Sequence, residues 1–295
     1  MDLAGRNMLI GLGGQRCGSS WLHKMLAMHP KILPAEGAKE AHFFDRNWHR
    51  GLEWYNGLWP DSGQDRMTCW ESTPSYLYQV ESRRRIAKTV PQARFIVLLR
   101  DPVGRSLSHY RRFKVNVGRS LDLAEAIRER PSILSFCSYA TALESYFDLF
   151  GRDRVFVGFY EDIALRPAGL YADILAFAGL PAFSLPESVL GQQVNGVRTP
   201  RNSAAYSLLF GAKKWLYQNG FHGVVHAVHQ TGFMNNVLSR PGSQPEQAQL
   251  APDQIARLYR LRLDQIAALE KIGIDAHRWS EPSGARAVAE RTGVA

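Results

Sequence analysis

Cysteine is scarce in this chain: Cys17, Cys69 and Cys137 are the only three among 295 residues, and no two of them form a CxxC pair. An odd, widely spaced set of this kind argues against a disulfide framework and against a cysteine zinc site. Free thiols are typical of a reducing compartment, so the sequence predicts a cytoplasmic protein.

Long hydrophobic runs are also lacking. The first apolar run, residues 8–13, is too short to cross a bilayer, and it leads into a glycine-rich motif instead of a signal-peptide cleavage site. We therefore interpret this run as a buried strand, and we predict neither a leader peptide nor a membrane anchor.

Acidic residues are outnumbered, with 27 Asp and Glu against 36 Lys and Arg, which gives a formal net charge of +9. Such an excess of positive charge indicates an anionic partner. Phosphorylated cofactors, acidic glycans, nucleic acids and membrane surfaces all meet this condition, and the sign of the charge does not choose among them.

The 45% of hydrophobic residues is enough to build a real core. Short apolar runs alternate with segments of helical periodicity, which predicts an α/β fold whose central parallel sheet is flanked by helices. We expect a single domain over residues 1–280 and a flexible C-terminal tail over residues 281–295. The expected strands are residues 8–13, 94–99 and 154–159, and the expected helices are residues 19–29, 132–150 and 252–272.

The octapeptide GGQRCGSS, residues 13–20, lies between the first expected strand and the first expected helix. It keeps the glycine spacing of the nucleoside triphosphatase loop, but Ser19 stands where that loop carries its lysine. Backbone amides in such a loop can bind a phosphate, and Arg16 suits a compact terminal anion better than a magnesium-bound triphosphate. The alternative is a simple glycine-rich turn between strand and helix.

The longer segment GGQRCGSSWL resembles the 5′-phosphosulfate loop of sulfotransferases that use 3′-phosphoadenosine-5′-phosphosulfate (PAPS), with arginine in place of the usual lysine. The resemblance implies a P-loop-like sulfotransferase fold that binds PAPS and releases 3′,5′-adenosine bisphosphate (PAP). It implies that Arg16 is a catalytic and donor-binding residue beside the bridging oxygen of the phosphosulfate, and that Trp21 lies near the adenine. The other donor-binding residues of the loop would be Cys17, Gly18, Ser19 and Ser20.

A second anion site is indicated by RFIVLLRDP, residues 94–102, and the RSLSHY sequence that follows. Taken alone, this is a strand end followed by a solvated basic helix. The segment is similar to the one with which the same family binds the 3′-phosphate of PAPS. The resemblance places Arg100 and Ser108 on that phosphate.

The candidate base lies in KEAHFFD, residues 39–45. Without context, Glu40 is an ordinary surface acid and His42 a packed or capping residue. The segment resembles a motif of the heparan sulfate and related carbohydrate sulfotransferases, in which the glutamate is the catalytic base. The resemblance assigns that role to Glu40, with His42 as a supporting residue or a reserve base.

The segment ESTPSY, residues 71–76, resembles a further stretch of that family, which borders the acceptor site and often contributes a lysine near the sulfate. Ser72 stands where that lysine would be, which indicates an acceptor less acidic than heparan sulfate. The alternative is a simple turn before a helix.

The remaining predictions concern the C-terminal third. In the resembled family a basic loop folds over the donor, and Arg198 and Arg201 match its place, although a solvated loop is the commoner explanation. We expect a variable, helix-rich acceptor or lid region over residues 204–240, with peripheral membrane contact through residues 204–239 as an option and core packing as the commoner explanation. Three histidines at helical spacing could form a metal site, but the resembled chemistry needs no metal: His222, His226 and His229.

The motifs together predict a sulfotransferase that moves the sulfuryl group of PAPS to an acceptor hydroxyl, with a glycan or glycolipid as the expected partner. A small-molecule, secondary-metabolite or lipid hydroxyl is the alternative. A kinase would need the loop lysine that is missing. A basic nucleic-acid or membrane-binding module would leave the Glu40 segment unexplained, so no nucleic-acid partner is predicted.

Overall fold

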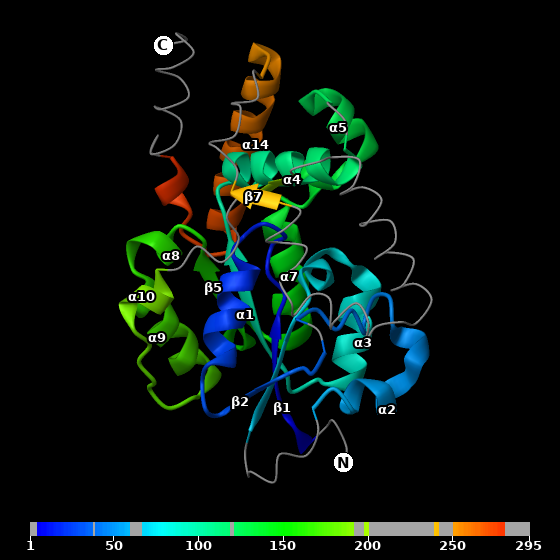
Figure 1. The fold of residues 1–295 in the computed structure, drawn as a ribbon, viewed down its shortest axis with the longest axis vertical. Helices are drawn as coiled ribbons and strands as arrows, with labels where there is room; N and C mark the ends of the chain where they lie inside the picture. Colours follow the sequence, from blue (N-terminus) through cyan, green and yellow to red (C-terminus); the bar gives the residue numbers. More distant parts are fainter. Residues whose placement is uncertain are drawn as a thin grey trace.

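The structure is a computed structural model that describes residues 5–37, 39–59, 67–118, 121–191, 198–200, 239–241 and 250–280. Its centre is a five-stranded sheet in the order β2-β3-β1-β4-β5, and every paired strand in it runs parallel to its neighbour (Figure 1). The predicted α/β fold with a central parallel sheet is therefore confirmed. The strands are β1 (Asn7–Gly11), β2 (Ile32–Pro34), β3 (Thr68–Ser72), β4 (Arg94–Leu99) and β5 (Val155–Phe159).

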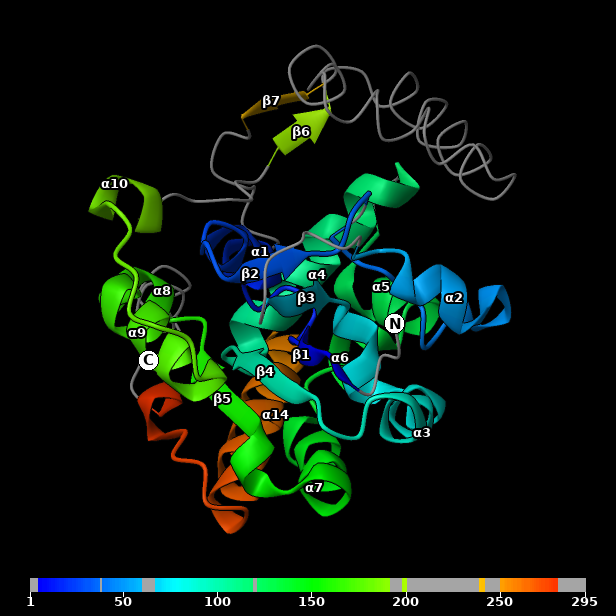
Figure 2. The same cartoon turned by 90° about the horizontal axis from the view of Figure 1, so that it is seen from below.

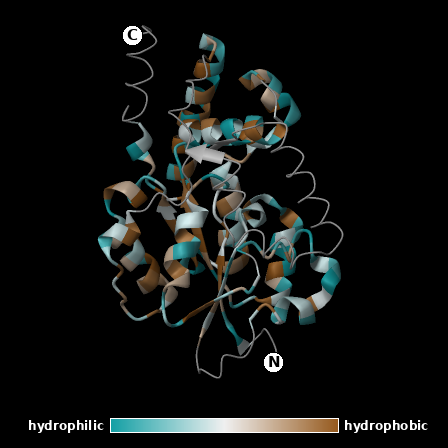
Figure 3. Cartoon of the chain, viewed as in Figure 1, coloured by the Kyte–Doolittle hydropathy of each residue, from teal (hydrophilic) through white to brown (hydrophobic). Residues whose placement is uncertain are grey.

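Helices cover both faces of this sheet, as the turned view shows (Figure 2). Along β1, Met8 and Ile10 pack into one hydrophobic cluster while Leu9 packs into another on the opposite face. Parallel strands buried on both faces are nearly continuous hydrophobic runs, and Figure 3 shows this as brown along the central strands. The first cluster includes residues of α3 (Val80–Thr89), α7 (Tyr139–Phe150) and α14 (Pro252–Lys271), and the second includes residues of α1 (Ser19–Ala27) and α9 (Pro167–Ala178).

The remaining elements are short, apart from one helix that starts at the end of β4. That helix is α4 (Pro102–Val117), and it packs against α14. The others are α2 (Gly51–Asn56), α5 (Leu123–Glu129), α6 (Ser132–Ser135), α8 (Asp162–Leu165) and α10 (Glu187–Leu190), with an antiparallel pair formed by β6 (Arg198–Pro200) and β7 (Ser239–Pro241). Single 3-10 turns are η2 (Trp48–Arg50), η3 (Pro74–Tyr78), η4 (Arg152–Arg154) and η5 (His277–Trp279).

The expected helix over residues 132–150 is wrong, because the chain forms α6 and α7 with a break between them. The break lies beside the guanidinium of Arg105, which donates hydrogen bonds to the carbonyls of Ser132 and Ile133. The sequence analysis also missed β2 and β3. The other expected boundaries differ by one or two residues, and Arg94–Leu99 was predicted at both ends.

All three cysteines are free, as their spacing predicted, and all three are buried. None of the helices in the described ranges is long and apolar enough to cross a membrane. The predicted tail after residue 280 and nearly all of the predicted lid region over residues 204–240 lie outside the described residues.

Candidate active site

The carboxyl ends of three neighbouring strands meet at one edge of the sheet. Gly11 at the end of β1 pairs with Ser72 on β3, and on its other side it pairs with Ile96 on β4. The glycine-rich loop after β1 and the strand ends at Ser72 and Arg100 are therefore neighbours. The carboxyl edge of a parallel sheet is where α/β proteins bind their ligands.

The glycine-rich loop turns sharply before α1. Arg16 has a φ of 75° and Gly18 a φ of 90°, both in the left-handed region. A Cβ atom on Gly18 would lie 2.6 Å from Cδ1 of Ile163, so this position needs glycine. Helix α1 begins at Ser19 without a side-chain cap and without an acidic residue in its first turn, which leaves its first amides able to bind an anion.

Two of the predicted loop residues point into the protein. The Cys17 side chain is fully buried, and its Sγ lies 3.8 Å from the hydroxyl of Tyr139, so only its main chain can contact a donor. The Trp21 indole is 3% exposed and donates a hydrogen bond of 2.8 Å to the carbonyl of Leu190. Contact between Trp21 and adenine stays a prediction.

The predicted 3′-phosphate residues meet the loop arginine. Arg100 donates from Nη1 to the carbonyl of Arg16 at 3.1 Å, and Arg16 donates from Nε to the hydroxyl of Ser108 at 3.1 Å. Burial lowers the pKa of Arg16, and the positive charges of Arg112, Arg100 and Arg111 lower it further. Within the described ranges, no ion pair joins Arg16 or Arg100 to a carboxylate. Arginines that lack a carboxylate partner among the described residues therefore lie close together beside a phosphate-type loop. This arrangement suits a polyanionic ligand.

A buried arginine on α4 contacts the backbone of the glycine-rich loop. Arg105 is fully buried on α4 and donates from Nε to the carbonyl of Gln15 at 3.1 Å. Its Nη2 lies 2.6 Å from Nδ1 of His109, and burial together with the charge of Arg105 lowers the pKa of that histidine to about 3. His109 is therefore neutral at pH 7 and can accept the hydrogen bond. The loop conformation is thus held by a fixed guanidinium.

A lysine from the segment after β2 also contacts the loop. The Lys39 ammonium donates to the hydroxyl of Ser19 at 3.0 Å and to that of Ser20 at 3.2 Å. The same ammonium lies 3.5 Å from a carboxylate oxygen of Glu40. Lys39 therefore connects the predicted donor loop to the predicted base.

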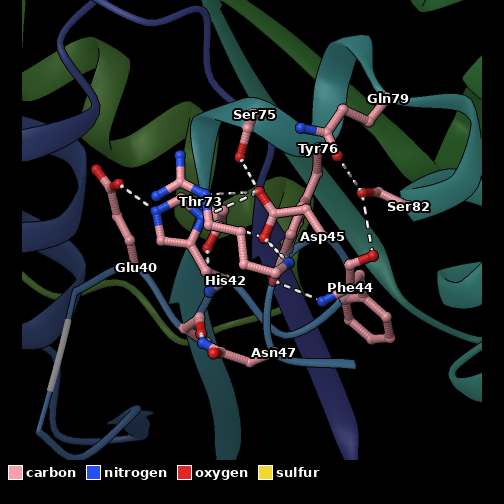
Figure 4. A network of polar contacts seen from close by, with 12 residues as sticks. Glu40, His42, Phe44, Asp45, Asn47, Thr73, Ser75, Tyr76, Gln79 and Ser82 are labelled. Carbon is pink, nitrogen blue, oxygen red and sulfur yellow. Dashed lines mark hydrogen bonds and ion pairs between the residues drawn. The ribbon is translucent and has the colours of Figure 1, made fainter. Parts of the chain in front are cut away.

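Glu40 and Asp45 flank the imidazole of His42, as Figure 4 shows. Nε2 of His42 is 3.1 Å from Oε2 of Glu40, and Nδ1 is 3.0 Å from Oδ2 of Asp45. Burial alone would lower the pKa of His42, but its hydrogen bonds with Asp45 and Glu40 raise that pKa to about 9. The imidazole is therefore charged at pH 7, and both of its nitrogens are engaged.

The carboxylate of Glu40 is held ionised. Burial would raise its pKa, but the hydrogen bond from His42 and the charge of Lys39 keep the pKa below its usual range. The side chain of Glu40 is 38% exposed, whereas that of Asp45 is 2% exposed and also accepts a 2.6 Å hydrogen bond from Ser75. Glu40 is thus the accessible carboxylate, and Asp45 anchors the far side of the imidazole.

The backbone of His42 is held in an uncommon conformation with a φ of 49°. Its amide donates to the hydroxyl of Thr73 at 3.3 Å, and that hydroxyl donates to the buried carboxylate of Glu71 at 2.7 Å. Positive φ at a residue other than glycine persists where surrounding contacts enforce it, as they do here.

Most of the C-terminal residues that were predicted to bind the donor or a metal lie outside the described residues. Arg198 begins β6, Arg201 lies outside the described residues, and so do His222, His226 and His229. Across the described ranges no cluster of three His, Cys, Asp or Glu side chains could hold a metal ion, and the absence of a metal stays a prediction. Four residues near the site were not predicted from the sequence: Lys39, Arg105, Arg111 and Arg112. Of these, Lys39 stands next to Glu40 in the KEAHFFD segment.

Comparisons with known proteins identify the family of the chain. The protein-family model described as "Sulfotransferase domain" matches residues 7–196 of this chain. Heparan sulfate glucosamine 3-O-sulfotransferase 3A1 of the mouse is 36% identical over 125 residues, which cover 42% of this chain and 28% of that protein. The human bifunctional heparan sulfate N-deacetylase/N-sulfotransferase 3 is 35% identical over 105 residues, covering 34% of this chain and 12% of that protein.

Solved structures share the fold. A sulfotransferase from Alicyclobacillus acidocaldarius has a TM-score of 0.62 at 21% identity, covering 94% of this chain and 100% of that chain. A mouse sulfotransferase complexed with PAP has a TM-score of 0.50 at 11% identity, covering 90% and 88% of the two chains. At these identities the likeness concerns the fold.

Proposed function

The chain belongs to the sulfotransferase domain family, and on this basis we propose that it transfers the sulfuryl group of PAPS to a hydroxyl of a carbohydrate or glycoconjugate. One observation carries the proposal: Arg16, Arg100 and Ser108 meet at the loop, and Lys39 joins that loop to the carboxylate of Glu40. The residues that would bind the two phosphates of the donor therefore lie at the same edge of the sheet as an accessible base.

The donor residues divide by position. The amides at the start of α1, with the hydroxyls of Ser19 and Ser20, bind the 5′-phosphate. Arg100 and Ser108 bind the 3′-phosphate. Arg16 belongs to the 5′-phosphosulfate loop, beside the bridging oxygen, and its contacts with Arg100 and Ser108 connect the two parts of the donor site. PAPS, when bound, supplies a sulfuryl group attached to a phosphate that can leave. A mouse sulfotransferase of similar fold was crystallised with PAP, which supports this choice of donor.

The acceptor hydroxyl gives its proton to Glu40. The His42 imidazolium holds the carboxylate of Glu40 in place, and Asp45 fixes the other side of the ring. Because both ring nitrogens are engaged, His42 orients the base and does not replace it. A positioned carboxylate of this kind contributes a rate factor of about 10² to 10⁴ as a general base.

The choice of a carbohydrate acceptor rests on the relatives named as heparan sulfate sulfotransferases, of whose length this chain spans less than a third. Position 72 holds a fully buried serine, where the resembled family often has a lysine near the sulfate. This favours a weakly charged sugar or glycolipid over a densely sulfated chain. We place the enzyme in the cytoplasm, where its three buried thiols stay reduced.

Calorimetric titration of the purified protein with PAP, with 5′-AMP and with ATP plus magnesium tests the donor assignment. Binding that depends on the 3′-phosphate supports the proposal, while preference for ATP favours a kinase. Binding to none of these nucleotides favours a basic binding module. Labelled PAPS with an unsulfated glycosaminoglycan oligosaccharide, a glycolipid and a phenol then tests the acceptor, and transfer to the phenol alone would overturn the carbohydrate assignment.

A further inference from the structure

The Lys39 ammonium occupies an unusual position for a flexible side chain. Three oxygen atoms surround it: the hydroxyls of Ser19 and Ser20 at 3.0 and 3.2 Å, and a carboxylate oxygen of Glu40 at 3.5 Å. Its side chain is 24% exposed. Lysine loses considerable rotamer entropy when it is fixed in this way, so the arrangement has an energetic cost. The two serine hydroxyls are neutral, and Glu40 is the one charged partner of the three.

The charge environment makes the position more unusual. Burial lowers the pKa of Lys39, the neighbouring Glu40 carboxylate raises it, and the charge of Arg16 lowers it again. A surface lysine paired with a glutamate would feel little of this. Lys39 thus places a positive charge beside the two loop serines and the base, where the sulfuryl group would pass from donor to acceptor.

A neighbouring strand end provides no such cation. The amide of Ser72 donates to the carbonyl of Lys39 at 3.3 Å, so the two positions lie side by side. Ser72 is fully buried, and its hydroxyl has no hydrogen-bond partner among the described residues. Of these two adjacent positions on the acceptor side of the loop, Lys39 is the one that carries a charge.

We propose that Lys39 is a catalytic residue whose ammonium binds the sulfuryl group during its transfer. The inference rests on the proposed function. As the acceptor oxygen bonds to sulfur, the bond between sulfur and the 5′-phosphate oxygen breaks and its electron pair goes to the phosphate. The acceptor proton goes to Glu40. Lys39 keeps its proton and stabilises the negative charge on the sulfuryl oxygens, from a fixed place between Ser19, Ser20 and Glu40.

The decisive comparison is between PAP, which lacks the sulfuryl group, and PAPS, which carries it. Lys39→Met should leave the dissociation constant of PAP within about threefold of the unaltered protein while the affinity for PAPS falls about tenfold. The single-turnover transfer rate should fall about a hundredfold or more, as for the loss of one charged donor to a transition state. Lys39→Arg should recover part of both losses. Lys88→Met, at an exposed position on α3, is the matched control.

Three results would overturn the inference. Equal losses of PAP and PAPS affinity in Lys39→Met would make Lys39 a support of the loop. An unchanged transfer rate would remove its role in the reaction, and an arginine variant no better than methionine would show that the charge is not what matters. Absence of PAP binding in the unaltered protein would overturn the proposed function, and this inference with it.

Discussion

Arg262 and Asp101 form a paired ion contact, with Nε to Oδ1 at 2.9 Å and Nη2 to Oδ2 at 2.8 Å. Asp101 also caps α4 by accepting from the amides of Val103 and Gly104, and it directly follows Arg100. Arg262 lies on α14, outside the segment that the family model matches. The C-terminal helix therefore holds the chain between β4 and α4, next to Arg100, in place.

Replacing Arg262 by methionine should cost about 2 kcal/mol of unfolding free energy, because a charge-assisted hydrogen-bond pair is lost while Asp101 keeps its capping amides. PAP affinity should fall as well, since Arg100 is adjacent to the freed aspartate. Urea unfolding and PAP titration measure the two effects. Arg260→Met, at an exposed position on the same helix, is the control. Equal losses in both variants would refute the role of the pair.

Glu40→Gln should lower the transfer rate about a hundredfold or more, because the amide cannot accept the acceptor proton. The dissociation constant of PAP should stay within about threefold, since the donor residues are untouched. Rapid-quench transfer assays with labelled PAPS measure the rate. Glu36→Gln, an exposed neighbour, is the control. Normal transfer by Glu40→Gln would remove Glu40 as the base.

Arg100→Ala should weaken PAP binding about tenfold to a hundredfold, the worth of a charge-assisted contact with a phosphate. Binding of 5′-AMP should change little, because the lost contact is with the 3′-phosphate. Calorimetry with both nucleotides measures the difference. The control is Arg84→Ala on α3, whose side chain is 76% exposed. A parallel loss of 5′-AMP affinity would place Arg100 elsewhere on the donor.

His42→Gln should change the pH dependence of stability. The pKa of His42 in the folded protein is raised from 6.5 to about 9, so the folded state binds this proton more tightly than the unfolded state. The resulting stabilisation, about 3 kcal/mol at most, is fully present below pH 6.5 and is lost as the pH rises through 9. Urea unfolding of both proteins at pH 6 and pH 10 measures it. A stability difference that is the same at both pH values would contradict the raised pKa.

Residues close together in the sequence carried most of what could be predicted. Arg94–Leu99 could be predicted as a strand because it is a mainly apolar run followed by Arg100 and an Asp-Pro pair that starts a helix. A donor-binding loop could be predicted because Arg16, Gly18 and the two serines stand within a few positions, and its role in binding stays a prediction. Arg100 and Ser108 were predicted from one short segment, and in the structure each of them contacts Arg16 of the loop.

Contacts between distant segments could not be predicted in this way. Arg105 reaches the carbonyl of Gln15 across a separation of 90 positions, and the sequence contains no local sign of that bond. The strand β3 was missed because its five buried residues include Glu71, whose carboxylate is satisfied by Tyr55 and Thr73. The role of Lys39 became visible only once the loop and the Glu40 segment were placed side by side.

The burial of all three cysteines has a practical consequence. Burial raises the pKa of Cys17 to about 12 and also raises that of Cys69, which keeps the two thiols protonated and slow to alkylate. Cys137 is fully buried as well. A new cysteine introduced at a solvent-exposed position would therefore be the one thiol that a maleimide dye labels quickly in the native protein. A fluorescent reporter can be attached to this molecule without first removing its natural cysteines.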